Sequence, residues 1–311
     1  MDFQLNEDQS VLAGAVQSAC QPWRDLPADH KRVNAFYAGD LQRKLKADGY
    51  LDPIAGGLST LDAGLIVLET ATLPVVVEAS GSALIAPHVL PGEEIAGPIA
   101  LLSGDLTKPQ RNLTIARVAL VDIGDDVVLL PIDQADVETV ETYLGFPYGR
   151  FKVAPDLSRG RRLGAVALAA LRQWSRVALT LECAGAAATA VAFTVDYVRQ
   201  RMVFGRPVGS FQAVQHRIAQ CHQIAQGMRW VGLYAAFTGE ARDADLAAAY
   251  AQQHIHKVVF DLHQFNGGMG VTYEHKLHFW TYRLRGLQSE VGGATGAALA
   301  VADARWPVKA A

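Results

Sequence analysis

The distribution of proline is the feature of this 311-residue sequence that most restricts its fold. Eleven of the 13 prolines lie at or before Pro155, and only Pro207 and Pro307 follow it. Proline has no backbone N–H donor and breaks helix interiors, so residues 156–206 and 208–306 can form very long helices. The carboxyl-terminal half of the chain is therefore predicted to be helical.

The hydrophobic pattern of this half predicts a bundle. The stretch from 163 to 201 is rich in alanine and carries apolar residues at three- and four-residue spacing. Short connections between long helices favour an antiparallel arrangement. The predicted helices cover residues 163–201, 211–238, 243–265, 274–288 and 297–305.

The character of the sequence changes between Leu84 and Pro155, where prolines separate short apolar runs that are typical of strands. A Gly-Asp-Asp sequence at 124–126 lies between two of these runs and predicts a hairpin turn. The predicted strands cover residues 99–102, 118–121 and 127–130.

Residues 2–80 show three shorter helical patterns with breaks between them. Pro22 and Trp23 end the first pattern, and Ser59 or Thr60 is suited to cap the third. The sequence thus predicts a mostly α protein with a small β domain. The predicted domains are an amino-terminal helical domain at 1–83, a shortened β domain at 84–155 and a carboxyl-terminal helical bundle at 156–311.

Charge and composition argue against several classes of function. Lys and Arg total 28 against 31 Asp and Glu, a net charge of −3, so the chain has no basic excess for nucleic acid. Its three cysteines are odd in number and far apart, which fits a reducing compartment and gives no metal-site spacing. The acidic start does not resemble a signal peptide, and charges and prolines interrupt the apolar stretches. We expect a soluble, cytoplasmic protein with no metal and no membrane partner.

The first motif that can carry chemistry is Arg-x-x-Phe-Gly-x-Pro-Val-x-x-Phe-Gln at 201–212. Ser210 is a suitable N-cap for the helix that follows, and Arg201 and Arg206 flank this turn. Guanidinium groups beside a helix amino terminus form an anion site suited to phosphate or pyrophosphate. The alternative is a connecting loop whose arginines are only solvated.

The second motif is Gln-x-x-Gly-Gly-x-Gly-Val-Thr-x-Glu at 264–274. Three glycines in four positions allow the backbone to approach a ligand or another chain closely. Alternatively, Gly267 and Gly268 end one helix and Thr272 caps the next. Both interpretations can hold together.

The two motifs together resemble the signatures of the acyl-CoA dehydrogenase family, in the same order and at the family's usual separation. Residues 1–9 also resemble the family's first helix, and the helical–β–helical order agrees. The resemblance implies tetramers built from dimers, with FAD bound across the dimer interface.

The resemblance also implies which side chains hold the adenine and pyrophosphate end of FAD, while the flavin ring lies in the neighbouring subunit. An arginine and a helix amino terminus suit the pyrophosphate, and an aromatic ring and a glutamine suit adenine. The residues implied are Arg201, Phe204, Phe211, Gln212, Gln264, Gly267 and Gly268.

The sequence departs from the family at the flavin end of this site. The family's β domain carries a Thr-Glu-Pro-like stretch with Gly-Ser-Asp, which holds the isoalloxazine and the acyl thioester. Residues 84–155 contain no such stretch. The flavin half of the site is therefore expected to be missing from this chain.

The family's catalytic base is also missing from its two known locations. These align with Val291 and with Ser175, and neither residue is acidic. Glu290 stands one residue away, but a one-residue displacement on a helix turns a side chain by about 100°. A local bulge would compensate for this. We interpret Glu290 as a solvated surface residue, expect no catalytic residue in this chain, and keep Glu290 as the alternative base.

Other titratable residues are assigned structural roles. Glu182 is interpreted as a paired structural carboxylate and Cys183 as a small buried residue. His254 and His256 are two residues apart and do not share a helix face, so the histidines are expected in polar core or interface positions. The histidines concerned are His254, His256, His263, His275 and His278.

These features lead to one hypothesis and two alternatives. The chain resembles the short subunit of heteromeric (α2β2) acyl-CoA dehydrogenases that act on steroid side-chain CoA thioesters in lipid metabolism. A longer partner subunit would supply the flavin pocket and the base, and an electron acceptor flavoprotein would reoxidise the FAD. The alternatives are a self-sufficient homomeric dehydrogenase that uses Glu290, and a flavin-free assembly or regulatory subunit.

Overall fold

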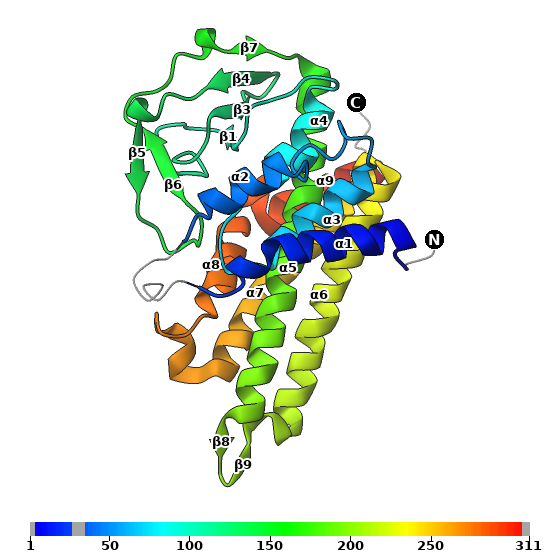
Figure 1. The fold of residues 1–311 in the computed structure, drawn as a ribbon, viewed down its shortest axis with the longest axis vertical. Helices are drawn as coiled ribbons and strands as arrows, with labels where there is room; N and C mark the ends of the chain where they lie inside the picture. Colours follow the sequence, from blue (N-terminus) through cyan, green and yellow to red (C-terminus); the bar gives the residue numbers. More distant parts are fainter. Residues whose placement is uncertain (1–3, 27–34, 307–311) are drawn as a thin grey trace.

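The computed structural model describes residues 4–26 and 35–306. The structure is mostly helical with two small β-sheets, which confirms the predicted fold class (Figure 1). Of the opening motif at 1–9, residues 1–3 lie outside the described part of the chain. The domain boundaries at 83/84 and 155/156 stay predictions.

The amino-terminal helices form where the apolar pattern predicts them. Ser59 rather than Thr60 is the cap of the third, since its hydroxyl accepts from the backbone N–H of Asp62 and Asp62 bonds back to the Ser59 N–H. A π-helical turn at Ser80–Ile85 precedes the fourth helix and was not predicted. The helices are α1 (Glu7–Cys20), α2 (Gly39–Ala47), α3 (Thr60–Ala71) and α4 (Ala86–Val89).

The three predicted strands all form, but three short strands of the same region and a fourth just after it, at 161–162, were not predicted. The hairpin at 124–126 joins β3 to β4 as expected, whereas β1 pairs with β3 in parallel. The sheets have the orders β1-β3-β4-β7 and β2-β6-β5. The strands are β1 (Ile99–Ser103), β2 (Gln110–Arg111), β3 (Val118–Asp122), β4 (Val127–Pro131), β5 (Val137–Val140), β6 (Tyr148–Phe151) and β7 (Arg161–Arg162).

The bundle is built around one long central helix, α5, which packs against α3, α6, α7 and α8. In the described residues, α5 is the helix long and apolar enough to cross a membrane, and 72% of its apolar window is buried inside the molecule. It is therefore a core helix. The bundle helices are α5 (Ala165–Gln200), α6 (Gln212–Thr238), α7 (Ala241–Asn266), α8 (His278–Leu287) and α9 (Gly293–Arg305).

Two predicted helix starts are wrong, one because turns take up its first residues and one because the helix begins earlier than predicted. The prediction of a helix from 274 is four residues early, since a 3₁₀ turn at Gly267–Val271 and further turns precede α8. Thr272 does not cap α8 either, because its hydroxyl donates to the carbonyl of Met269. The last helix begins four residues before the predicted position 297, at Gly293.

The sheets and the small hairpin β8–β9 lie at opposite ends of the molecule (Figure 1). The hairpin joins β8 (Met202–Val203) to β9 (Arg206–Pro207) between α5 and α6. About 25 residues of α5 separate Ser175, level with the sheets, from Gln200, which corresponds to about 38 Å of helix. The first motif, which begins at Arg201, is therefore far from the part of α5 that faces the sheets.

A buried carboxylate joins the helical amino-terminal region to the first sheet. Glu78 is almost fully buried and accepts hydrogen bonds from the N–H groups of Gly81 (2.6 Å) and Ile99 (3.0 Å). It also accepts from the N–H and the hydroxyl of Ser82. Burial raises the pKa of Glu78, and the hydrogen bonds oppose that shift. Gln42 clamps the backbone of the same residue, with its amide bonded to both the Glu78 N–H and the Glu78 carbonyl.

Candidate functional site

A cavity of about 470 Å³ lies between the first sheet and α5, and the turn before α9 closes one side of it. Ser175 and Val291, the two positions that align with the family's base, both line this cavity. Glu290 lines it as well. The structure thus brings together three positions that the sequence could relate only by alignment.

Glu290 is not a solvated surface residue, and that interpretation is wrong. Its side chain is 27% exposed, and its carboxylate lies 2.7 Å from the Nε of Arg111. The reason is local backbone geometry. Val291, Gly292 and Gly293 all have positive φ, at 47°, 84° and 63°, so the chain does not continue as a helix through this turn. The displacement of 100° that applies to a regular helix therefore does not apply here.

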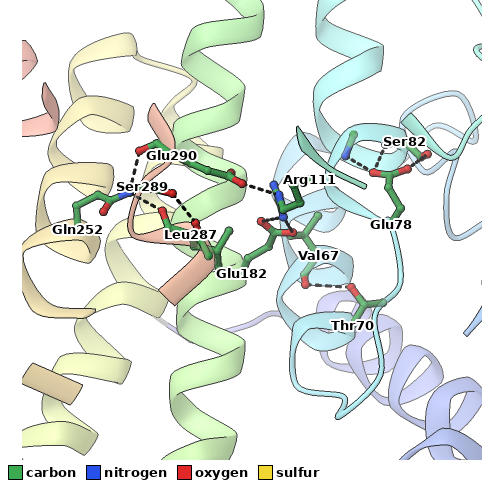
Figure 2. A network of polar contacts seen from close by, with 12 residues as sticks. Val67, Thr70, Glu78, Ser82, Arg111, Glu182, Gln252, Leu287, Ser289 and Glu290 are labelled. Atoms are coloured by element: carbon green, nitrogen blue, oxygen red, sulfur yellow. Dashed lines mark hydrogen bonds and ion pairs between the residues drawn. The ribbon is translucent and has the colours of Figure 1, made fainter. Parts of the chain in front are cut away.

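Arg111, from β2, lines the cavity and binds two carboxylates, of which Glu290 lines the same cavity (Figure 2). Its Nη1 donates to both oxygens of Glu182 at 3.0 Å, and its Nε pairs with Glu290. The guanidinium also lies 4.7 Å from the ring centroid of Phe146. The prediction that Glu182 is a paired carboxylate is confirmed. We call Arg111, Glu182 and Glu290 the charge cluster.

The charge cluster has two acids and one base, so it carries one surplus negative charge when all three groups are ionised. Burial opposes ionisation of Arg111, but the two carboxylates outweigh it and its pKa lies above the ordinary value. Burial raises the pKa of Glu290 to about 7; Arg111 opposes that shift, and the negative charge of Glu182 adds to it. A carboxyl group with this pKa can hold or release a proton at neutral pH.

A buried glutamine supports the turn that carries Glu290. The amide nitrogen of Gln252, in α7, donates to the carbonyls of Leu287 (2.9 Å) and Glu290 (3.1 Å). Ser289 closes the same turn through its hydroxyl, which donates to the carbonyl of Gly286 (3.1 Å). Figure 2 shows Gln252 on one side of the turn and Arg111 on the other. Sequence reasoning missed both residues, because they lie far along the chain from Glu290 and belong to no local motif.

The residues that the resemblance assigns to FAD lie together at the end of the bundle away from the cavity. The first turns of α6 contact the last turns of α7, where Arg217 pairs with Asp261 and stacks on Phe265. We call this end of the bundle the distal tip. It includes all seven assigned residues: Arg201, Phe204, Phe211, Gln212, Gln264, Gly267 and Gly268.

Most side chains of the distal tip face outward. Phe204 is 92% exposed and has a positive φ of 52° in the β8–β9 hairpin. Arg206 stacks on the ring of Phe211, with 4.0 Å to the centroid. In the part of the chain that the structure describes, no carboxylate pairs with Arg201, and a Cβ on Gly268 would meet nothing within 4 Å. An unpaired guanidinium and exposed glycine backbone are each suited in kind to contact a phosphate.

The predicted N-cap at Ser210 is wrong. The Ser210 hydroxyl donates to the carbonyl of Pro207 (2.8 Å), and Phe211 stands at the cap position of α6 without a side-chain bond. Ser210 belongs to a 3₁₀ turn at Val208–Ser210, and its hydroxyl is bonded at the start of that turn. The first backbone N–H groups of α6 therefore lack a capping side chain.

Of the remaining titratable residues, Cys183, His275 and His278 are buried as predicted, His254 and His263 are half-buried, and His256 is exposed. Cys183 is fully buried, and burial raises its pKa. His275 is buried against the rings of Phe193 and Tyr197, and burial lowers its pKa. Within residues 4–26 and 35–306, no group of three His, Cys, Asp or Glu side chains is placed to hold a metal ion.

Comparisons with known proteins agree with this architecture. Residues 164–300 match the model of the family described as acyl-CoA dehydrogenase, C-terminal domain. The chain is 30% identical over 237 residues to the acyl-CoA dehydrogenase IpdE2 of Mycolicibacterium smegmatis, covering 72% of this chain and 75% of that protein.

Two solved structures share the fold. The ChsE4-ChsE5 complex of Mycobacterium tuberculosis is 22% identical, with a TM-score of 0.79 over 100% of both chains. The Tcur3481-Tcur3483 steroid ACAD is 23% identical, with a TM-score of 0.73 over 96% of this chain and 97% of that one.

Proposed function

The chain belongs to the acyl-CoA dehydrogenase family, and from this we propose that it is one subunit of a heteromeric, FAD-dependent acyl-CoA dehydrogenase. The reaction is α,β-dehydrogenation of an acyl-CoA thioester. FAD supplies, when bound, the acceptor for the hydride that leaves the β carbon. The distal tip of this chain binds the adenine and pyrophosphate end of that FAD, in a site whose flavin pocket belongs to a longer partner subunit.

The observation that carries this proposal is the outward orientation of the distal tip. Its exposed groups fit a dinucleotide in kind: a guanidinium at Arg201, amides at Gln212 and Gln264, and the apolar aromatic ring of Phe204. Arg201 follows about 38 Å of helix beyond Ser175 at the cavity, and Gln264 lies about 18 Å of helix beyond Gln252, which contacts the turn that carries Glu290. These side chains therefore serve a site completed by another subunit.

Two relatives suggest the partner and the substrate class. The ChsE4-ChsE5 structure is a complex of two proteins, and the Tcur3481-Tcur3483 protein is described as a steroid ACAD. By analogy, we propose a heterotetramer acting on a bulky steroid side-chain CoA thioester. One active site per dimer in place of two leaves room for such a substrate. The partner supplies the base, and an electron acceptor flavoprotein reoxidises the FAD.

Flavin stoichiometry tests the proposal. This chain purified alone should bind FAD poorly, because it lacks the family's flavin-pocket stretch. Co-expression with the partner should yield a complex with about one FAD per heterodimer, measured by flavin absorbance against protein mass. Two flavins per heterodimer would refute the division of the site.

A second candidate is favoured by the position of Glu290. It lines a cavity in this chain beside both family base positions and has a pKa near neutrality. On this alternative, the chain's own cavity binds the acyl thioester and Glu290 removes the α proton.

The Glu290→Gln variant separates the two candidates. Glutamine keeps the size of the side chain but cannot accept the α proton. If the partner carries the base, as we propose, turnover of the complex with saturating acyl-CoA and a dye should stay within a few-fold of wild type. A base typically contributes about 10²–10⁴-fold, so a loss beyond about a hundredfold with flavin intact would establish the second candidate. The control is Glu138→Gln. Glu138 lies on β5, is half-exposed and pairs with Arg150 on β6, so this variant should keep wild-type turnover.

A further inference from the structure

The turn that carries Glu290 is strained and is held from two sides. Val291 is a β-branched residue with φ of 47°, and two glycines with positive φ follow it. A non-glycine residue in this conformation is strained and persists only where the surroundings fix it. Without that support, the segment would relax and the carboxylate would leave the cavity wall.

We propose that Gln252 and Arg111 are positioning residues, which together hold Glu290 against the cavity wall as an ionisable carboxyl group. Gln252 fixes the backbone of the turn, and Arg111 fixes the side chain. This inference goes beyond the proposed function, because it concerns how the carboxyl group is held and protonated, whether or not Glu290 is the proton acceptor of the reaction.

Gln252 is suited to this role because its donors are fully used on the turn. It is 1% exposed, and its amide nitrogen bonds the carbonyls at both ends of the segment from Leu287 to Glu290. Its carbonyl oxygen is buried and has no hydrogen-bond partner among the described residues. The side chain therefore serves the turn and nothing else that is described. An apolar replacement would leave two buried carbonyls without donors, which favours opening of the turn.

Arg111 is suited to its role by the rigid geometry of the guanidinium group. Nη1 is committed to both oxygens of Glu182, which leaves Nε to meet Glu290 from a fixed direction. Glu182 is held bidentately, whereas Glu290 has one described bond to Arg111 and lines the cavity. Uptake of a proton by Glu290 would therefore remove the surplus negative charge of the cluster.

The other charged groups around the cavity are paired among themselves. Arg172 bonds Asp122 across the cavity (2.7 Å), and Arg176 bonds Asp245 (3.0 Å). The hydroxyl-bearing ring of Tyr148, on β6, is buried beside the charge cluster, and burial raises its pKa to about 12, so it stays neutral. Burial has the largest effect on the pKa of Glu290, and Arg111 and Glu182 are the charged groups among the described residues that shift it further.

The direct test is the titration of Glu290 in the full-length protein, assembled with its partner and labelled with ¹³C at the glutamate carboxyl carbons. The signal of Glu290 is the one that disappears in Glu290→Gln. In the wild type it should titrate near pH 7. In Gln252→Leu the carboxyl group should gain solvent, and its pKa should fall by about one unit or more, toward the ordinary value of about 4.3.

The matched control is Gln42→Leu. Gln42 is also a buried glutamine that clamps the backbone beside a glutamate, but it acts on Glu78. Gln42→Leu should reduce the stability of the protein as Gln252→Leu does, but it should leave the pKa of Glu290 unchanged. An unchanged titration in Gln252→Leu would overturn the positioning role.

Glu182→Gln is a second variant that leaves the turn untouched and covers the case in which Gln252→Leu does not fold. It removes the surplus negative charge, so the pKa of Glu290 should fall, whereas Arg111→Met should raise it. Arg111→Lys should restore part of the wild-type value. Shifts in the opposite sense would overturn the role of Arg111. None of these titrations requires turnover. Their outcome therefore tests the positioning of Glu290 separately from the question of whether Glu290 or the partner provides the base.

Discussion

Replacing Arg201 by alanine is expected to weaken FAD binding by the assembled complex about 10- to 150-fold. On the proposed division of the site, this guanidinium bonds a flavin phosphate, and a charge-assisted hydrogen bond contributes about 1.5–3 kcal/mol. At about 1.4 kcal/mol per tenfold change, that energy gives the stated range. The measurement is the FAD dissociation constant of the complex, obtained by following flavin fluorescence on dilution.

Arg199→Ala is the matched control, because Arg199 is also exposed and lies two residues earlier in the last turn of α5. It should leave the dissociation constant within about twofold, as expected for a surface charge without a specific partner. If Arg201→Ala retains FAD as the wild type does, the distal tip does not hold the pyrophosphate. In that case the flavin-free assembly subunit becomes the better account.

Glu78→Gln is expected to lower the free energy of unfolding by about 2–5 kcal/mol. Each oxygen of Glu78 accepts two hydrogen bonds in the wild type. A glutamine offers one oxygen, and its NH₂ group would face the remaining donors, so two buried donors lose their acceptor at about 1–3 kcal/mol each. Denaturant unfolding of the complex and of the chain alone measures this loss.

Glu93→Gln is the control for Glu78→Gln, since Glu93 is half-exposed and pairs with Arg161 on the surface. It should change the free energy of unfolding by less than about 0.5 kcal/mol. A loss below about 1 kcal/mol in Glu78→Gln would mean that the N–H groups of Gly81 and Ile99 find other acceptors. The hydrogen bonds of the Glu78 carboxylate would then not be needed to link the amino-terminal helical region to the first sheet.

Much of the fold could be predicted because its signals are local. The long helix α5 follows from alanine content and from the absence of proline, and β3 and β4 follow from two apolar runs around one turn. The shorter strands could not be predicted. Strands β2 and β7 are two residues each and polar, and their partners lie far along the chain, at β6 and β4.

The candidate site, like the fold, could be predicted only where its residues are close together in the sequence. The distal tip is marked by two contiguous motifs, and its assignment to FAD stays a prediction. The charge cluster joins three segments that are far apart in sequence, so no spacing points to Arg111. The error at Glu290 came from treating 289–293 as a regular helix, although two consecutive glycines in this stretch were a sign of a break.

The length of α5 sets a constraint on how this protein can change over generations. One inserted or deleted residue between Ser175 and Gln200 would turn the distal tip by about 100° relative to the cavity and move it by about 1.5 Å. The distal tip and the cavity would then no longer have their present orientation to each other. Substitutions at the distal tip or at the cavity could not restore it. We therefore expect natural length variation to be confined to the surface turns and the β region, while the number of residues in α5 stays fixed.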